Sequence, residues 1–178
     1  MSSPFVLSVD DDNGCTLSTS FQFAGGRFRH SIEWMRSDGE IVDRWQDEVN
    51  SQDEDWPASP PIQQLSLESI HGSPTLLGVG QAGKSHWSIS VEAMRIDTKP
   101  SLKFDVACRC RELPNWLGSS YQRSLRMVDQ VPAIQMIDVS CATNLVQPAL
   151  IVTCKIEAWA IKKYPATFRW TYLIEVLI

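Results

Sequence analysis

The stretch TLLGVGQAGKSHWSISVEAMRIDTKPSLKFDVACRCRE, residues Thr75–Glu112, decides the fold. Near its centre the apolar residues Trp87, Ile89 and Val91 are separated by single polar residues. This period of two is the spacing of a β-strand that turns one face to a core. A second run of the same kind covers residues 102–111, and turn-forming residues lie between the two runs. The stretch therefore predicts antiparallel strands joined by tight turns.

The same stretch contains one formal motif. Gly78, Gly83, Lys84 and Ser85 match G-x-x-x-x-G-K-[ST], the phosphate-binding P-loop, in which the lysine and serine open a helix. Because a strand pattern follows directly, we predict that residues 78–85 form a strand end and a turn and do not bind nucleotide. The alternative is a nucleotide-dependent phosphotransferase that places Lys84 on the outer phosphates and Ser85 on Mg²⁺.

The composition is that of an ordinary globular domain. The chain has 178 residues, of which 43% are hydrophobic and 21% charged, and its formal net charge is −5. These values predict one domain over residues 1–178 with its own core. The acidic balance argues against nucleic acid as a partner, because binding to phosphate backbones needs clustered Lys and Arg. There is no signal-peptide pattern and no membrane-length apolar run, so we expect a cytoplasmic protein that does not enter a membrane.

Five cysteines are spread along the chain, an odd number that argues against a disulfide framework. Cys108 and Cys110 share the alternating face of Phe104 and Val106, which predicts two buried, reduced thiols in the core. No cysteine or histidine pair has zinc spacing. We therefore expect neither a metal nor a cofactor.

Residues 16–48 read as a three-stranded meander with turns at Gly25-Gly26 and Asp38-Gly39. His30 falls on its apolar face, where a histidine is more often a satisfied core or interface residue than a base or ligand. Just before the meander, the sequence DDDNG at 10–14 lacks the ligand spacing of a calcium loop and is interpreted as a solvated turn.

Residues 47–61 combine acidic residues with three prolines, which predicts an exposed loop. A short strand is expected after it, over 62–70. Residues 113–127 show the least strand character, and we expect a loop or a short helix there. Strand character resumes over 131–142.

The end of the chain predicts a closing hairpin, with alternating strands at 150–160 and 168–176. Apolar residues also interrupt its polar face, and a protein in water seldom leaves such a patch uncovered. Either loops of the same chain or a second copy would cover it, so a homodimer is one expectation. The residues in question are Trp159, Ile161, Leu173 and Leu177.

Taken together, the turn signals predict about nine strands and at most one or two short helices. We expect an all-β fold, or a β-dominated α+β fold, in which antiparallel meanders form a sandwich or a barrel.

No hydrolase signature is present in the sequence. The favoured interpretation is therefore a non-catalytic binding or interaction module for a small anionic ligand or a protein partner. Charged residues opposite the core, followed by a loop with aromatic residues, are typical of such a surface. The expected binding residues are Lys84, His86, Arg109, Arg111, Trp116 and Tyr121.

Overall fold

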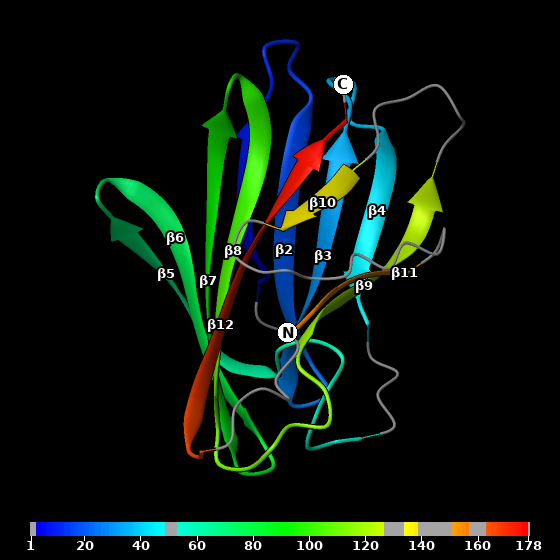
Figure 1. Cartoon of the computed structure of the whole chain (residues 1–178). Helices are drawn as coiled ribbons and strands as arrows, with labels where there is room; N and C mark the ends of the chain where they lie inside the picture. The colour runs from blue at the N-terminus through cyan, green and yellow to red at the C-terminus, as the bar shows by residue number, and fades with distance from the viewer. Residues whose placement is uncertain (1–2, 49–52, 127–133, 139–150, 157–162, 178) are drawn as a thin grey trace.

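The computed structural model describes the chain except for residues 1–2, 49–52, 127–133, 139–150, 157–162 and 178. The described residues form twelve strands and no helix, so the all-β expectation is confirmed. The strands make two antiparallel six-stranded sheets that pack face to face, as Figure 1 shows. Of the two expected architectures, the sandwich is therefore correct and the barrel is not.

Sheet A has the strand order β1-β2-β3-β4-β9-β11. Its strands are β1 (Phe5–Asp10), β2 (Thr16–Ala24), β3 (Arg27–Met35), β4 (Ile41–Asp47), β9 (Gly118–Arg126) and β11 (Ile151–Lys155).

Sheet B has the order β10-β12-β8-β7-β6-β5. Its strands are β5 (Ile62–Ile70), β6 (Ser73–Ala82), β7 (Ser85–Ile96), β8 (Lys99–Cys110), β10 (Ile134–Asp138) and β12 (Ala166–Val176). The chain completes β1 to β4 in sheet A, makes β5 to β8 in sheet B, and then alternates between the sheets.

The alternation found in the sequence produces the core. In β7 the apolar residues Trp87, Ile89 and Val91 are buried, while His86 and Ser88, on the opposite face, are exposed. Sheet A turns its own large side chains toward them. The largest fully buried side chains come from both sheets and include Phe21, Ile32, Trp45, Tyr121, Trp87, Phe104, Trp170 and Tyr172.

The predicted thiol positions are confirmed as buried. Cys108 and Cys110 are both fully buried, and their sulfur atoms lie 3.5 Å apart on one face of β8. The hydrogen bond with Cys110, and then burial, raise the pKa of the Cys108 thiol. Cys141 lies outside the described residues.

Four expectations need correction. The predicted closing hairpin does not exist, because β11 pairs with β9 in sheet A whereas β12 pairs with β8 and β10 in sheet B. Residues 113–127 contain a strand, β9, in place of a loop or short helix. The chain also has more strands than expected, since neither β1 nor β9 was predicted.

The fourth correction concerns residues 47–61. Among those that the structure describes, Trp56 is only 6% exposed and Ser59 only 2%, so the segment is not a solvated loop throughout. Ser59 donates a hydrogen bond to the carbonyl of Ser120, and Ser120 N–H donates to the carbonyl of Ala58. The segment thus packs against β9 on its way from sheet A to sheet B.

Candidate functional site

The outer face of sheet B carries the core of the site expected from the sequence. His86 in β7 and Arg109 in β8 are cross-strand partners, and both are exposed. The row continues on either side, because Gln81 of β6 pairs with His86 and Thr167 of β12 pairs with Arg109. Directly opposed side chains on one face of a sheet are close enough to contact the same group. The register that the site required is therefore present.

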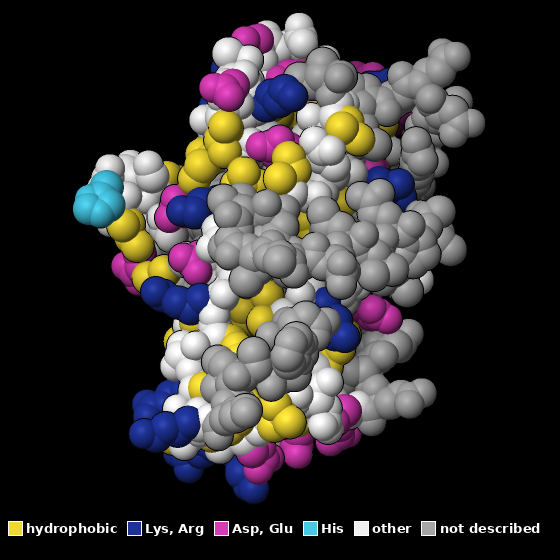
Figure 2. All heavy atoms as spheres, viewed as in Figure 1, with side chains coloured by type: hydrophobic (Ala, Val, Ile, Leu, Met, Phe, Trp, Pro, Cys, Tyr) yellow, Lys and Arg dark blue, Asp and Glu magenta, His cyan; other side chains and the backbone are white. Residues whose placement is uncertain are grey.

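Two further predicted residues lie at the end of this row. Lys84 belongs to the turn between β6 and β7, and its ammonium pairs with Glu112 at 3.3 Å. Arg111 follows β8 and is exposed. Figure 2 shows Lys and Arg side chains gathered at the lower end of the molecule, where β8 ends and β12 begins.

Arg169 joins this group although it was not predicted as a site residue. It is exposed in β12 and lies opposite Ala107, one diagonal step from Arg109. Its place on the polar face of an alternating strand was evident in the sequence. The signal was missed because β12 was expected to pair with β11, which would have placed Arg169 far from β8.

A shallow hollow borders the row. It has a volume of about 330 Å³ and opens on the outer face between β5, β6 and β7. His86 reaches its rim. The other residues that line it are Gln63, Gln64, Val79, Gly80, Gln81 and Trp87. Amide side chains and an imidazole around a small apolar floor can hold a polar ligand by several hydrogen bonds.

The remaining two predicted residues do not belong to this face. Trp116 is half-buried and packs against the core. Tyr121 lies in β9 and is completely buried between the sheets, so the expectation that it sits in a recognition loop is wrong. Its hydroxyl instead takes part in an internal chain of hydrogen bonds.

That internal chain joins the two sheets. The ring nitrogen Nε2 of His30 lies 2.9 Å from the hydroxyl of Tyr121, which lies 2.7 Å from the hydroxyl of Tyr172. The ring of Phe21 stacks on His30 at 4.7 Å between centroids. The interpretation of His30 as a satisfied core residue is therefore confirmed.

Burial sets the protonation of these groups. Desolvation is the main cause that lowers the pKa of His30, with nearby Arg29 acting in the same direction and Asp47 against it. Desolvation likewise raises the pKa of Tyr121 and Tyr172. All three groups are thus held neutral, which suits a structural chain better than general acid–base catalysis.

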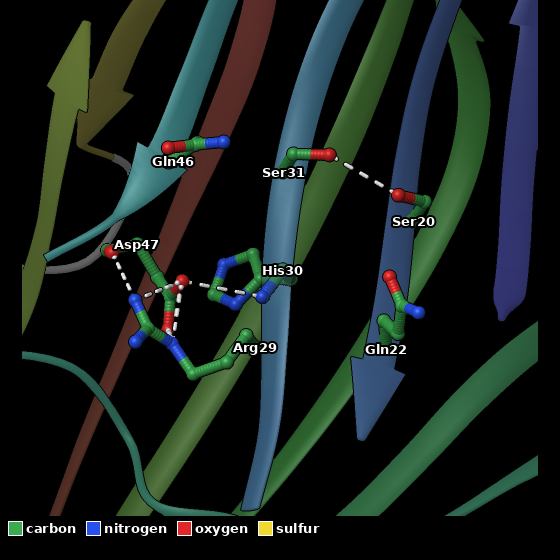
Figure 3. Close-up of a pocket in the computed structure, with 7 residues that line it drawn as sticks. All are labelled: Ser20, Gln22, Arg29, His30, Ser31, Gln46 and Asp47. Carbon is green, nitrogen blue, oxygen red and sulfur yellow. Dashed lines mark hydrogen bonds and ion pairs between the residues drawn. The ribbon is translucent and has the colours of Figure 1, made fainter. Parts of the chain in front are cut away.

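A second hollow, of about 350 Å³, lies on the outer face of sheet A over β2, β3 and β4 (Figure 3). Asp47 accepts hydrogen bonds at its side-chain oxygens from Nε and Nη2 of Arg29, each as short as 2.8 Å, and from the backbone N–H of His30 at 3.3 Å. Nη2 of Arg29 also donates to the backbone carbonyl of Asp47 at 2.7 Å. The guanidinium is thus already neutralised. The rest of the lining comes from Ser20, Gln22, Ser31 and Gln46.

Residues 78–85 form the end of β6, a turn and the start of β7, as predicted. No helix follows. Gly83 has φ +51°, and a Cβ placed on it would lie 2.7 Å from a carboxylate oxygen of Asp55. A carboxylate packed against the glycine would repel the phosphate that a P-loop must hold at this place. The geometry argues against the phosphotransferase alternative.

Within the described part of the chain, no group of three His, Cys, Asp or Glu side chains is placed to hold a metal ion. Nor do those residues include any helix with the length and apolar character of a membrane span. Comparisons with protein-family models, curated proteins and solved structures found no match.

Proposed function

We propose that the protein is a non-catalytic binding module and that its working surface is the outer face of sheet B around His86 and Arg109. The ligand would carry a carboxylate or phosphate group, either as a small molecule or as part of a protein partner. Guanidinium groups bind both kinds of anion through two parallel hydrogen bonds, which favours this chemistry.

The proposal rests on one observation, the ion pairing of the arginines. Five arginines in the described residues are paired with carboxylates: Arg29, Arg36, Arg44, Arg95 and Arg123. By contrast, Arg109, Arg111 and Arg169 make no ion pair within the same part of the chain, although they cluster at one end of sheet B. Arg27 of β3 is also in no ion pair there, but it lies in sheet A, where the charges of Arg29 and Asp47 act on it. Unpaired arginines on one face supply positive charge that a ligand can use. The sheet A hollow lacks this property, since Asp47 neutralises Arg29.

Titration with inorganic phosphate and pyrophosphate, followed by amide shifts in NMR spectra, tests the proposal. Saturable shifts should centre on His86 and Arg109. The substitution Arg109→Ala should weaken binding by about 1–3 kcal/mol, the range for a hydrogen bond to a charged group. His86→Ala should weaken it less, because an imidazole offers fewer hydrogen-bond donors to an anion than a guanidinium does.

Arg36→Ala is the matched control. It removes the same charge from the turn between β3 and β4 of the other sheet, where Arg36 pairs with Glu40. It should leave the affinity unchanged. Equal weakening by both substitutions would mean that only net charge matters, and the absence of saturable shifts with either anion would refute the binding site.

A further inference from the structure

The edge strand β5 (Ile62–Ile70) is open along one side. It is the last strand of sheet B, among the described residues it pairs only with β6, and Figure 1 shows the turn end of the β5–β6 hairpin standing away from the rest of the sandwich. An open edge is a template for pairing with another strand, and proteins usually block it with Lys, Pro or a short strand. β5 has nine residues, IQQLSLESI, with Glu68 as its single charge.

The turn decides which backbone groups face outward. β5 and β6 are joined by the two residues His71 and Gly72, both with positive φ, as in a type I′ turn. Such a turn closes on a hydrogen-bonded pair, here Ile70 and Ser73. From Ile70 back to Gln64, the even-numbered residues therefore bond to β6, and a bulge between Ile62 and Gln64 ends this alternation. Within that part of β5 the odd-numbered residues direct their N–H and C=O groups to the open edge, namely Leu65, Leu67 and Ser69.

The sequence of β5 is nearly symmetric about its central residue, Ser66, so two antiparallel copies would place similar or compatible side chains opposite each other. Around Ser66 it places Leu65 and Leu67 at equal distances on either side, then Gln64 and Glu68, then Gln63 and Ser69, and finally Ile62 and Ile70. In an antiparallel pair of two β5 strands centred on Ser66, leucine would lie opposite leucine. The amide of Gln64 would lie opposite the carboxylate of Glu68, to which it can donate a hydrogen bond.

The backbone permits the register that the side chains favour. Leu65 of one copy opposite Leu67 of the other joins two odd-numbered residues, so both outward-facing backbone pairs are used. A register centred on Glu68 would instead oppose two carboxylates, which is unfavourable. Leu67 is also 48% exposed, and pairing with Leu65 of the other copy would cover part of this apolar surface.

We infer that two copies of this chain associate through antiparallel pairing of their β5 strands about a two-fold axis at Ser66. The two B sheets then form one continuous sheet of twelve strands across the dimer. The interface is isologous, as a closed two-fold dimer requires. It differs from the surface expected from the sequence, which was the end of the chain around Leu173 and Leu177.

Light scattering and sedimentation equilibrium test the assembly. The wild-type protein should have twice the chain mass of 20.0 kDa at micromolar concentration. Leu67→Lys places a charge opposite Leu65 of the other copy and should give the monomer mass without loss of circular-dichroism signal. Val6→Lys is the matched control, because Val6 is 50% exposed on β1, the edge strand of sheet A. It should remain a dimer.

A cross-linking experiment tests the register and does not depend on Leu67. Ser66→Cys places two thiols opposite each other at the two-fold axis, so mild oxidation should convert the protein to a disulfide-linked dimer. Glu68→Cys separates the two new thiols along the strands and should react slowly.

A monomeric wild-type protein would overturn the inference. So would dissociation caused by Val6→Lys but not by Leu67→Lys, or faster cross-linking at residue 68 than at residue 66. None of these measurements involves an anionic ligand, so their outcome is independent of the proposed binding site.

Discussion

At the scale of single residues, several polar groups inside the sandwich are joined by hydrogen bonds that link the two sheets. Tyr121 is the centre of this arrangement, since its hydroxyl contacts both His30 of its own sheet and Tyr172 of the other. Close by, the indole N–H of Trp170 donates to the hydroxyl of Ser119 at 3.1 Å. A buried polar group that loses its hydrogen-bond partner still has the free-energy cost of its desolvation. The hydroxyl of Tyr121, which has two such partners, should therefore contribute most to the stability of this arrangement.

We therefore expect Tyr121→Phe to lower the free energy of unfolding by about 1–3 kcal/mol, because it leaves buried groups on His30 and Tyr172 without their partner. Urea denaturation measures the change. Tyr164→Phe is a suitable control, since the hydroxyl of Tyr164 has no hydrogen-bond partner among the described residues. If the two substitutions have equal effects, the chain of hydroxyls contributes nothing specific.

At the scale of elements, two glycines in β6, Gly78 and Gly80, allow the backbone at the start of β5 to lie very close to β6. A Cβ placed on Gly80 would overlap the carbonyl oxygen of Pro61, and one on Gly78 would lie 2.7 Å from Ile62 and 2.8 Å from Ile89. The backbone at Pro61 has little freedom to move, because Pro60 and Pro61 are both buried. These glycines thus serve the close packing of β5 on β6.

Gly80→Ala should consequently destabilise the fold by about 1–3 kcal/mol or more, the range for overpacking a close contact. Val79→Ala, on the neighbouring residue of the same strand, is the control. Val79 is 50% exposed, so a clearly smaller loss is expected. Thermal unfolding of the two variants compares them, and a Gly80→Ala protein as stable as the wild type would show that the start of β5 is free to shift.

At the scale of the whole molecule, the two sheets are joined by apolar packing and by the hydrogen bonds from His30 through Tyr121 to Tyr172. The burial of His30 makes this junction sensitive to acid. Its lowered pKa means that the unfolded chain, with a histidine pKa of about 6.5, binds a proton more readily than the folded protein does. The stability contributed by neutral His30 is therefore present above that pH and is lost as the pH falls below it.

Denaturant unfolding at pH 8 and pH 5 checks this expectation. The wild type should lose stability at pH 5, and His30→Gln, which cannot titrate, should lose less. His86→Gln removes an exposed histidine and should keep the full sensitivity. Identical pH dependence in the wild type and His30→Gln would assign the effect to other groups. The charged residues that influence His30 are Asp47 and Arg29.

The sequence alone determined which residues form most strands and which side of each strand is buried. The bounds expected for β5 agree with the structure, and the alternation in β7 and β8 placed His86 and Arg109 on one polar face. Both results depend on local information: turn residues set where strands end, and a period of two sets the face.

The tertiary structure decided which strands are neighbours. Nothing in an alternating pattern states a strand's partner, so β11 and β12 were read as a hairpin although they belong to different sheets. β9 was missed because its buried residues include Ser119 and Ser120. Serines suit a buried strand only when partners from distant segments, here Trp170 and Thr153, satisfy their hydroxyls. Pairing of distant segments likewise brought Arg169 beside Arg109, which no local pattern could specify.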